Sequence, residues 1–260
     1  MELTIYQIDA FTNERFKGNP AAVLPLERWL PDDLMQNIAQ ENNLAETAFF
    51  VPEEDGFRLR WFTPAVEVNL CGHATIATAH VLYEHLNYKK SKIEFQSKSG
   101  LLTVQKHDNQ YVLNFPTDTL MPIQNLLDIA QALGRLPQEV LKGRSDWMAI
   151  FETQEEIENL KPDFRKVAEL GGRGLIATAP GNEVDFVSRC FFPQSGIDED
   201  PVTGSAHTTL IPYWAKRLNK NELTARQLSS RGGTLHLKLL DDRTEIGGGA
   251  VTYLVGKIFI

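Results

Sequence analysis

Short runs of branched and aromatic residues, separated by polar segments that contain glycine or proline, dominate the hydrophobic pattern of the chain. Residues 3–11 form the first such run, which is typical of a β-strand. The same pattern predicts further strands near residues 46–51, 57–62, 92–96, 101–106, 110–115, 184–192, 235–240 and 251–260. Three consecutive glycines, at 247–249, predict a tight turn before the last of these strands.

Helices are predicted where apolar residues recur at longer intervals than in the strand-like runs. Pro31 and the acidic pair after it favour a helix start, because acidic side chains stabilise the first turn, and this helix is expected to run to about Glu41. Two helices rich in small apolar residues are expected over 74–86 and 206–218, the second containing Pro212, which must kink it or be tolerated. Shorter helical pieces are expected over 125–133 and 157–160.

Three short matches between the two halves of the chain indicate an internal duplication. They occur in the same order, at offsets of 131, 129 and 132 residues, and pair 44–48 with 175–179, 60–64 with 189–193, and 72–74 with 204–206. We therefore predict an N-terminal lobe over residues 1–116 and a C-terminal lobe over 117–250. Residues 116–122, which hold two prolines, form the expected linker. Chance similarity between strand-like segments is the alternative explanation.

Composition and charge argue against several classes of protein. The 260 residues carry 26 basic and 34 acidic side chains, a formal net charge of −8, which argues against nucleic acid or an anionic membrane as a partner. Two cysteines cannot form a disulfide framework. The first residues lack the basic and apolar regions of a signal peptide, and no apolar run approaches the length of a bilayer. We expect a soluble cytoplasmic protein.

Small-residue loops precede both expected apolar helices, at 70–73 and 201–205. Glycine permits close approach of a ligand, and free N–H groups at a helix N-terminus favour an anion. We therefore place the binding of a small anionic metabolite at Gly72, Thr203, Gly204 and Ser205. Ordinary tight turns before core helices are the alternative.

The differences between the halves point to a catalytic group. Glu46 lies where the second half has Ala177, in an apolar strand where desolvation would raise a carboxyl pKa and suit it to proton transfer. His73 begins the first apolar helix, and an aspartate from the acidic triplet 198–200 would orient its ring. A solvent-facing Glu46, a capping His73 and an N-capping acidic triplet are the corresponding structural alternatives.

Other chemistries find little support in the sequence. His73 and His80 lie on one helix face but lack a carboxylate at metal-ligand spacing, and there is no HExxH motif, so no metal site is expected. No dinucleotide fingerprint, nucleophile elbow or P-loop is present. A racemase with two thiols would place its cysteines symmetrically, but Cys71 matches Thr203 and Cys190 matches Trp61.

Several motifs in their order along the chain resemble the PhzF family, the phenazine-biosynthesis-like isomerases. They are residues 18–23, 43–49, 62–64, 71–75, 196–207 and 227–233, of which the run Glu-Asp-Pro-Val-Thr-Gly-Ser-Ala is the most specific. The resemblance implies an α+β, diaminopimelate-epimerase-like fold. It has two pseudo-symmetric lobes, each a curved, mostly antiparallel sheet around a central helix, and the C-terminal strand at about 251–260 returns to the first lobe. Homodimers are common in the family.

The resemblance also implies chemistry without cofactor or metal. The defining enzyme isomerises trans-2,3-dihydro-3-hydroxyanthranilate by moving a proton between ring carbons. Its catalytic glutamate, histidine and aspartate correspond to Glu46, His73 and Asp200, and Asn19 joins the expected substrate-binding residues. A member that binds a small acid or a protein without turnover is the runner-up. A related racemase or epimerase that depends on cysteine is the third possibility.

Overall fold

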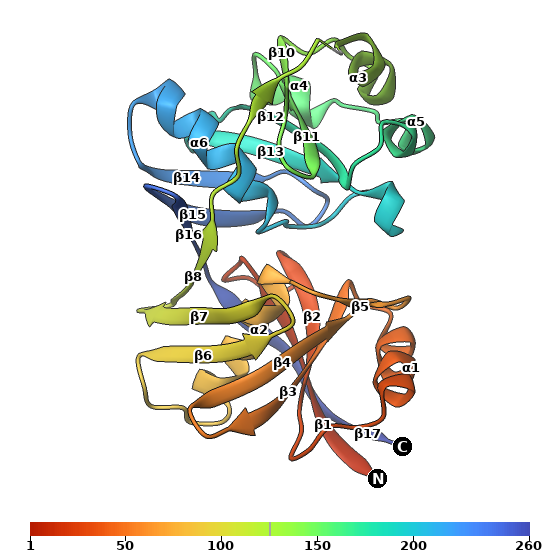
Figure 1. Ribbon diagram of the computed structural model, residues 1–260, viewed down its shortest axis with the longest axis vertical. Coiled ribbons are helices and arrows are strands. Elements are labelled where there is room, and N and C mark those ends of the chain that lie inside the picture. The colour runs from red at the N-terminus through yellow and green to blue at the C-terminus, as the bar shows by residue number, and fades with distance from the viewer. Residues whose placement is uncertain (125) are drawn as a thin grey trace. The chain divides into compact units, whose positions relative to one another are not determined.

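The computed structural model describes residues 1–124 and 126–260, and it divides into two compact units. Unit 1 comprises Met1–Asn114 and Gly247–Ile260, and unit 2 comprises Phe115–Ile246. The chain leaves unit 1 near the end of β8 (Gln110–Pro116) and re-enters it near the end of β16 (Arg243–Gly248). Both termini therefore belong to unit 1, where β1 (Glu2–Ala10) pairs antiparallel with β17 (Ala250–Phe259) (Figure 1).

Unit 1 combines antiparallel hairpins with two parallel pairings. Strands β1 and β2, β3 and β4, β6 and β7, and β7 and β8 pair antiparallel, whereas β2 pairs parallel with β3 and β4 parallel with β6. The remaining elements are β2 (Asn19–Pro25), α1 (Asp32–Asn42), β3 (Glu46–Glu53), β4 (Gly56–Phe62), β5 (Glu67–Val68), α2 (Gly72–Glu84), β6 (Lys92–Ser97) and β7 (Gly100–His107).

Helix α2 is the central helix of unit 1. Every residue from His73 to Leu82 is buried, as expected for a helix that is apolar all round. Two buried hydroxyls are satisfied within the helix, because Thr75 donates to the Cys71 carbonyl at 2.6 Å and Thr78 to the Ala74 carbonyl at 2.8 Å. The helix begins two residues before the predicted start at 74. His73 therefore lies in its first turn.

Unit 2 repeats the order of pairings found in unit 1. Strand β11 pairs parallel with β12, β12 antiparallel with β13, β13 parallel with β14, and β14 antiparallel with β15. Helix α6 lies between β13 and β14 in the chain, as α2 lies between β4 and β6. The elements are β9 (Met121–Pro122), α3 (Leu126–Leu133), β10 (Glu139–Lys142), β11 (Asp146–Ile150), α4 (Gln154–Glu158), α5 (Phe164–Glu169), β12 (Gly174–Pro180), β13 (Phe186–Phe191), a short 3₁₀ turn (Pro193–Ser195), α6 (Ala206–Leu218), β14 (Glu222–Gln227) and β15 (Gly233–Leu240).

The strand register corrects one residue-level correspondence of the predicted duplication. Arg60 faces Phe49, three residues after Glu46, whereas its sequence match Arg189 faces Ala177, three residues after Gly174. If the two arginines correspond, the counterpart of Glu46 is therefore Gly174 and not Ala177. The second half still has no carboxylate at that position.

Pro212 lies inside α6 and is accommodated by a contact from outside the helix. Proline lacks the N–H that would bond the carbonyl four residues earlier. That carbonyl, on Thr208, accepts instead from the backbone N–H of Asp118 at 3.2 Å. The Asp118 side chain accepts from the Thr209 hydroxyl at 2.9 Å. The segment after β8 therefore supplies the hydrogen bond that Pro212 removes.

The predicted tight turn at 247–249 is wrong. Gly247 and Gly248 belong to β16, and Gly249 alone separates β16 from β17. The glycines serve close packing: an added Cβ would lie 2.4 Å from the Phe11 ring at Gly248, and 2.1 Å from the Asn13 side-chain oxygen at Gly249. A run of glycines thus marks an approach of the chain to residues 11–13 rather than a reversal of direction.

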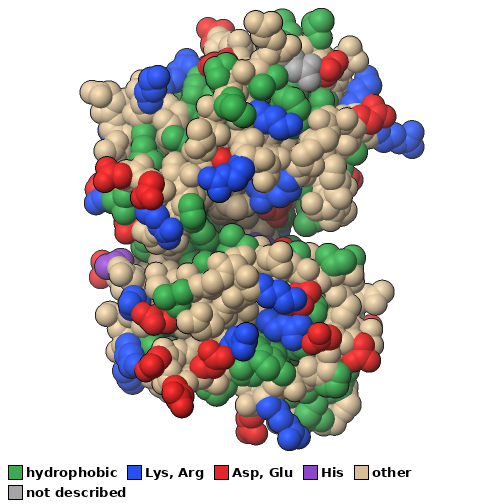
Figure 2. Space-filling view, in the orientation of Figure 1, with side chains coloured by type: hydrophobic (Ala, Val, Ile, Leu, Met, Phe, Trp, Pro, Cys, Tyr) green, Lys and Arg blue, Asp and Glu red, His purple; other side chains and the backbone are tan. Residues whose placement is uncertain are grey.

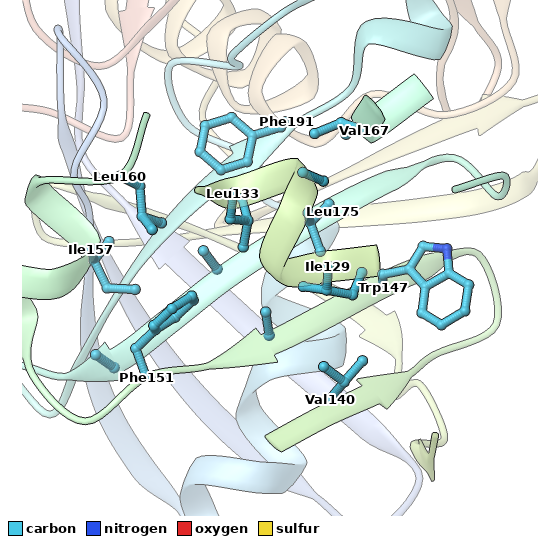
Figure 3. Packing of buried hydrophobic residues seen from close by; sticks show 14 of the residues in the cluster. Ile129, Leu133, Val140, Trp147, Phe151, Ile157, Leu160, Val167, Leu175 and Phe191 are labelled. Atoms are coloured by element: carbon cyan, nitrogen blue, oxygen red, sulfur yellow. The ribbon is translucent and has the colours of Figure 1, made fainter. Parts of the chain in front are cut away.

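The core of unit 2 lies between its helices and the strands β10 to β13. Figure 3 shows Phe151, Leu133 and Ile129 packed with residues of neighbouring strands and helices. Unit 1 has a corresponding cluster around Leu24, Met35 and Phe49, in which the rings of Phe49 and Phe62 meet edge to face at 5.6 Å. The helical piece expected over 125–133 is α3, except for residue 125, which lies outside the described residues.

On the face shown in Figure 2, basic and acidic side chains are interspersed over unit 1. Ion pairs join charged side chains of unit 1, such as that of Arg60 with Asp32 and Glu67. Among the described residues, no helix has the length and apolar character that crossing a membrane requires.

Candidate active site

Glu46 begins β3 and lies at the same end of the sheet as Asn19. The parallel pairing of β2 and β3 sets Ala21 opposite Glu46, so the first residues of both strands share one edge. Asn19 is completely buried. The bend before it requires Gly18, whose φ is +66° and where a Cβ would lie 2.1 Å from the Ala10 carbonyl oxygen.

The first turn of α2 brings His73 to Glu46. The His73 Nε2 atom lies 3.1 Å from Glu46 Oε2, and their side chains are 7% and 13% exposed. The two atoms are within ion-pair distance but are not aligned as a regular hydrogen bond, and neither has a hydrogen-bond partner among the described residues. Catalytic contacts in unliganded proteins are often poorly aligned in this way and tighten when substrate binds.

Cys71 contacts the other nitrogen of the same ring. Its Sγ atom lies 3.5 Å from His73 Nδ1, and both side chains are buried. Cys71 is also the N-cap residue of α2, but its side chain makes no capping hydrogen bond. A thiol, an imidazole and a carboxylate therefore follow one another in a chain within unit 1.

The charges in this chain favour a protonated imidazole. Burial alone lowers the pKa of His73, but the electrostatic interactions of the ring with Cys71 and Glu46 raise it well above its ordinary value. Burial also raises the pKa of the Cys71 thiol to about 11, so the thiol is neutral at pH 7. The Glu46 carboxylate is therefore the charge that stabilises the imidazolium near neutrality.

The same three side chains could hold a metal ion, because one ligand atom from each lies within 4.8 Å of the others. Their arrangement around the ring is unfavourable for a single ion. Glu46 contacts Nε2 and Cys71 contacts Nδ1, whereas a mononuclear site uses one ring nitrogen and leaves the other to a hydrogen-bonding partner. The geometry therefore favours a hydrogen-bonded chain.

In unit 2 the loop before α6 is organised around a buried carboxylate and a buried amide. The Thr203 hydroxyl donates to Asp200 Oδ2 at 2.5 Å, and Asp200 is 8% exposed. The completely buried Gln227 accepts from the Thr203 backbone N–H at 2.8 Å and donates to the Asp200 carbonyl at 2.7 Å. Gln227 thus fixes both ends of the segment that holds Asp200 and Thr203.

Ser205, the N-cap residue of α6, accepts a hydrogen bond from Arg173, a residue that no sequence pattern singles out. Arg173 Nη1 donates to Ser205 Oγ at 2.9 Å, and its Nε donates to the buried Asp146 carboxylate at 2.9 Å. Arg173 follows two glycines, at 171–172, which do not form a dinucleotide-binding motif and give no other indication of a site. The pairing of β11 with β12 sets Asp146 opposite Gly174 and so brings Arg173 to Asp146, a contact that no local pattern encodes.

The structure therefore places the predicted site residues in two groups. Glu46 and His73 are in contact, with Asn19 at the same sheet edge as Glu46 and Gly72 at the start of α2. Asp200 and Thr203 are in contact in unit 2, and Gly204 and Ser205 follow in the same loop. Cys71 and Gln227 join these groups, although sequence patterns gave neither a role in the site; Gln227 appeared only as part of a family motif.

Comparisons with solved structures define the class of fold. The probable proline racemase from Agrobacterium radiobacter superimposes with a TM-score of 0.67, covering 99% of this chain and 93% of that one. At 10% identity this likeness shows the fold alone. The chain is thus a mixed α/β protein with the fold found in racemases and epimerases.

Its family follows from much closer likenesses. The family model for phenazine biosynthesis-like proteins matches residues 8–256. The crystal structure of a PhzF-family protein from Enterococcus faecalis is 48% identical, with a TM-score of 0.98 over 100% of both chains. An uncharacterized isomerase from Pseudomonas aeruginosa is 50% identical over 258 residues, which is 99% of each chain, and another from Halalkalibacterium halodurans is 45% identical over 267 residues, covering 100% of each. This chain belongs to the PhzF family, as the sequence motifs predicted.

Proposed function

We propose that this protein is a cofactor-independent isomerase that moves a proton between two carbons of a small carboxylic acid resembling trans-2,3-dihydro-3-hydroxyanthranilate. The observation that carries the proposal is the buried contact between Glu46 Oε2 and His73 Nε2 at 3.1 Å. Two relatives that match the whole chain are named isomerases.

Glu46 is the acid and base of the proposed reaction. Its carboxylate accepts the proton from a carbon that conjugation has made acidic, and the electron pair of the broken C–H bond delocalises into the conjugated system. The resulting carboxyl group returns the proton to a second carbon, so that the substrate is isomerised and the enzyme is restored. A protonated His73 stabilises the carboxylate before and after this step.

Binding of the substrate anion is assigned to the small-residue loops. Asn19 and Gly72 lie in unit 1, and Thr203, Gly204 and Ser205 in unit 2. Arg173 adds a permanent positive charge beside Ser205. The catalytic role of Asp200 rests on its position in the family motif. An Asp200→Asn protein should therefore lose turnover while keeping its fold.

A cysteine-dependent racemase is less consistent with the environment of both thiols. Burial raises the pKa of Cys71 to about 11 and that of Cys190 well above its ordinary value. A base in such chemistry must be a thiolate. A protein that binds a small acid without turnover would cause no proton exchange, which separates this alternative from an isomerase.

The test is proton exchange in heavy water with a pool of small cellular acids. The wild-type protein should introduce deuterium into at least one metabolite, and Glu46→Gln should reduce that rate by at least ~100-fold, the usual contribution of a general acid–base. Mass spectrometry of the pool gives both the rate and the identity of the substrate.

Glu53→Gln is the matched control, because Glu53 ends the same strand and is exposed. It should exchange deuterium at the wild-type rate. Undiminished exchange by Glu46→Gln would refute the proposal. If neither protein causes exchange and both bind the same acid equally well, the chain is a binding protein.

A further inference from the structure

We propose that Cys71 is a positioning residue for His73, whose thiol engages ring atom Nδ1 so that the Nε2 atom carries its proton toward Glu46. This inference rests on the proposed function, because it concerns the histidine that faces the proposed acid–base. It assigns a role to a cysteine that takes no part in the proton transfer itself.

The two nitrogens of the His73 ring contact different side chains. Glu46 Oε2 lies 3.1 Å from Nε2, and Cys71 Sγ lies 3.5 Å from Nδ1. A neutral imidazole has one N–H donor and one acceptor nitrogen, and the partner at one nitrogen decides which tautomer forms. A thiol that donates to Nδ1 therefore places the remaining proton on Nε2, where it points to a carboxylate.

Burial makes the ring dependent on this thiol. His73 and Cys71 are each 6% exposed, so bulk water cannot replace the sulfur as partner of Nδ1. Among the described residues, Cys71 is the side chain that contacts Nδ1.

A thiol suits both charge states of the histidine. When the ring is neutral, the S–H group donates to Nδ1; when the ring is protonated, the N–H at Nδ1 donates to sulfur, a weak acceptor. Nδ1 therefore has a partner in both states, and leaving this buried nitrogen without one would be destabilising. The proton that distinguishes the two states is carried at Nδ1, so Nε2 keeps its own proton toward Glu46 in both.

Serine and alanine substitutions separate positioning from packing. Cys71→Ser keeps a hydroxyl that donates and accepts, whereas Cys71→Ala removes both functions. The matched control is Cys190→Ala, because Cys190 is also buried but its thiol contacts Gln227 in unit 2.

The experiment is nitrogen-15 NMR of histidine-labelled, substrate-free protein, with His73 assigned by its loss in a His73→Gln protein. We expect wild type, Cys71→Ser and Cys190→Ala to show neutral His73 protonated at Nε2. In Cys71→Ala the Nε2–H fraction should fall at least twofold and the titration midpoint of His73 should move. An unchanged tautomer and midpoint in Cys71→Ala would overturn the inference.

Deuterium exchange then connects the tautomer to turnover. Cys71→Ala should exchange about tenfold more slowly with a displaced pH profile, and Cys71→Ser should recover most of the rate. A complete loss in both variants would indicate a cysteine base instead and would overturn the inference. Because the NMR measurement needs no substrate, its failure is distinguishable from failure of the proposed function, which is decided by Glu46→Gln.

Discussion

At the scale of single residues, the catalytic candidates are recognisable from their motifs, but the side chains that hold them are not. Glu46 and His73 stand in family motifs, but their contact in unit 1 was not predicted, because the expected partner of His73 was an aspartate of the triplet 198–200. Gln227 is the opposite case: a glutamine at a strand end is unremarkable until β14 pairs with β13 and buries it beside Asp200.

Gln227 should stabilise the loop that holds Asp200 and Thr203. In a Gln227→Leu protein, the Thr203 N–H and the Asp200 carbonyl would lose their buried partner. Each of the two unsatisfied groups costs about 1–3 kcal/mol, so the free energy of unfolding should fall by about 2–6 kcal/mol. Urea denaturation followed by circular dichroism measures this change.

Gln96→Leu serves as the comparison, because Gln96 is an exposed residue of β6. Its unfolding free energy should stay within about 0.5 kcal/mol of wild type. Equal effects of the two substitutions would show that the Gln227 hydrogen bonds do not stabilise the loop.

At the scale of elements, the two central helices each bury a histidine in neutral form. His80 of α2 lies 3.0 Å from the Tyr111 hydroxyl and 2.9 Å from the Thr252 hydroxyl, so it ties the helix to β8 and β17. His207 of α6 lies 2.8 Å from the Thr203 carbonyl through Nδ1. Burial lowers the pKa of each to about 4.

These pKa values predict a loss of stability in acid. The unfolded chain binds a proton at each histidine near pH 6.5, whereas the folded chain does so near pH 4, so stability present at pH 7 is lost as the pH falls between these values. Each histidine contributes up to about 3 kcal/mol to this loss. Urea unfolding at pH 7 and pH 4.5 measures it.

A His80→Gln protein isolates one of the two contributions. It should be less stable than wild type at pH 7, but its stability should fall less steeply toward pH 4.5. His236→Gln, at an exposed position of β15, should keep the wild-type slope. A wild-type slope in His80→Gln would show that His80 is not buried in neutral form.

At the scale of the whole molecule, unit 1 carries an apolar surface along β17. Tyr253, Leu254 and Val255 are consecutive and are 45%, 40% and 55% exposed, so both faces of the strand are open there. Phe259 farther along is 78% exposed. Contiguous exposed apolar side chains are typical of an interaction surface, and we propose that a second copy of the chain covers this one.

A lysine in this strand should disrupt the proposed homodimer. Val255→Lys would place a charge in an apolar interface, and sedimentation velocity should show dissociation into monomers at concentrations where the wild type is dimeric. Leu127→Lys, on α3 of unit 2, is the control, because Leu127 is also exposed, at 72%. A monomeric wild-type protein would refute the proposal.

The elements that sequence patterns identified are those with strong local signals. Helix α1 begins with an acidic first turn. Helix α6 spans the predicted residues 206–218 although it contains Pro212. The strands β2, β10, β11, β12, β14 and β16 and the helix α5 were not predicted. An apolar run such as that in β11 fits a buried strand and a helix segment equally well. Their conformation is decided by the neighbours that they pair with or pack against.

The motifs of the sequence identify the family and supply the candidate residues, because motifs are local properties of the chain. Which of these side chains meet depends on the three-dimensional fold. It placed Cys71 and Glu46 on opposite nitrogens of His73, buried Gln227 under the Asp200 loop, and brought Arg173 to Ser205. It also assigned the glycines at 247–249 to close packing. Contacts of this kind depend on strand register and helix placement, which long-range packing fixes and no local pattern records.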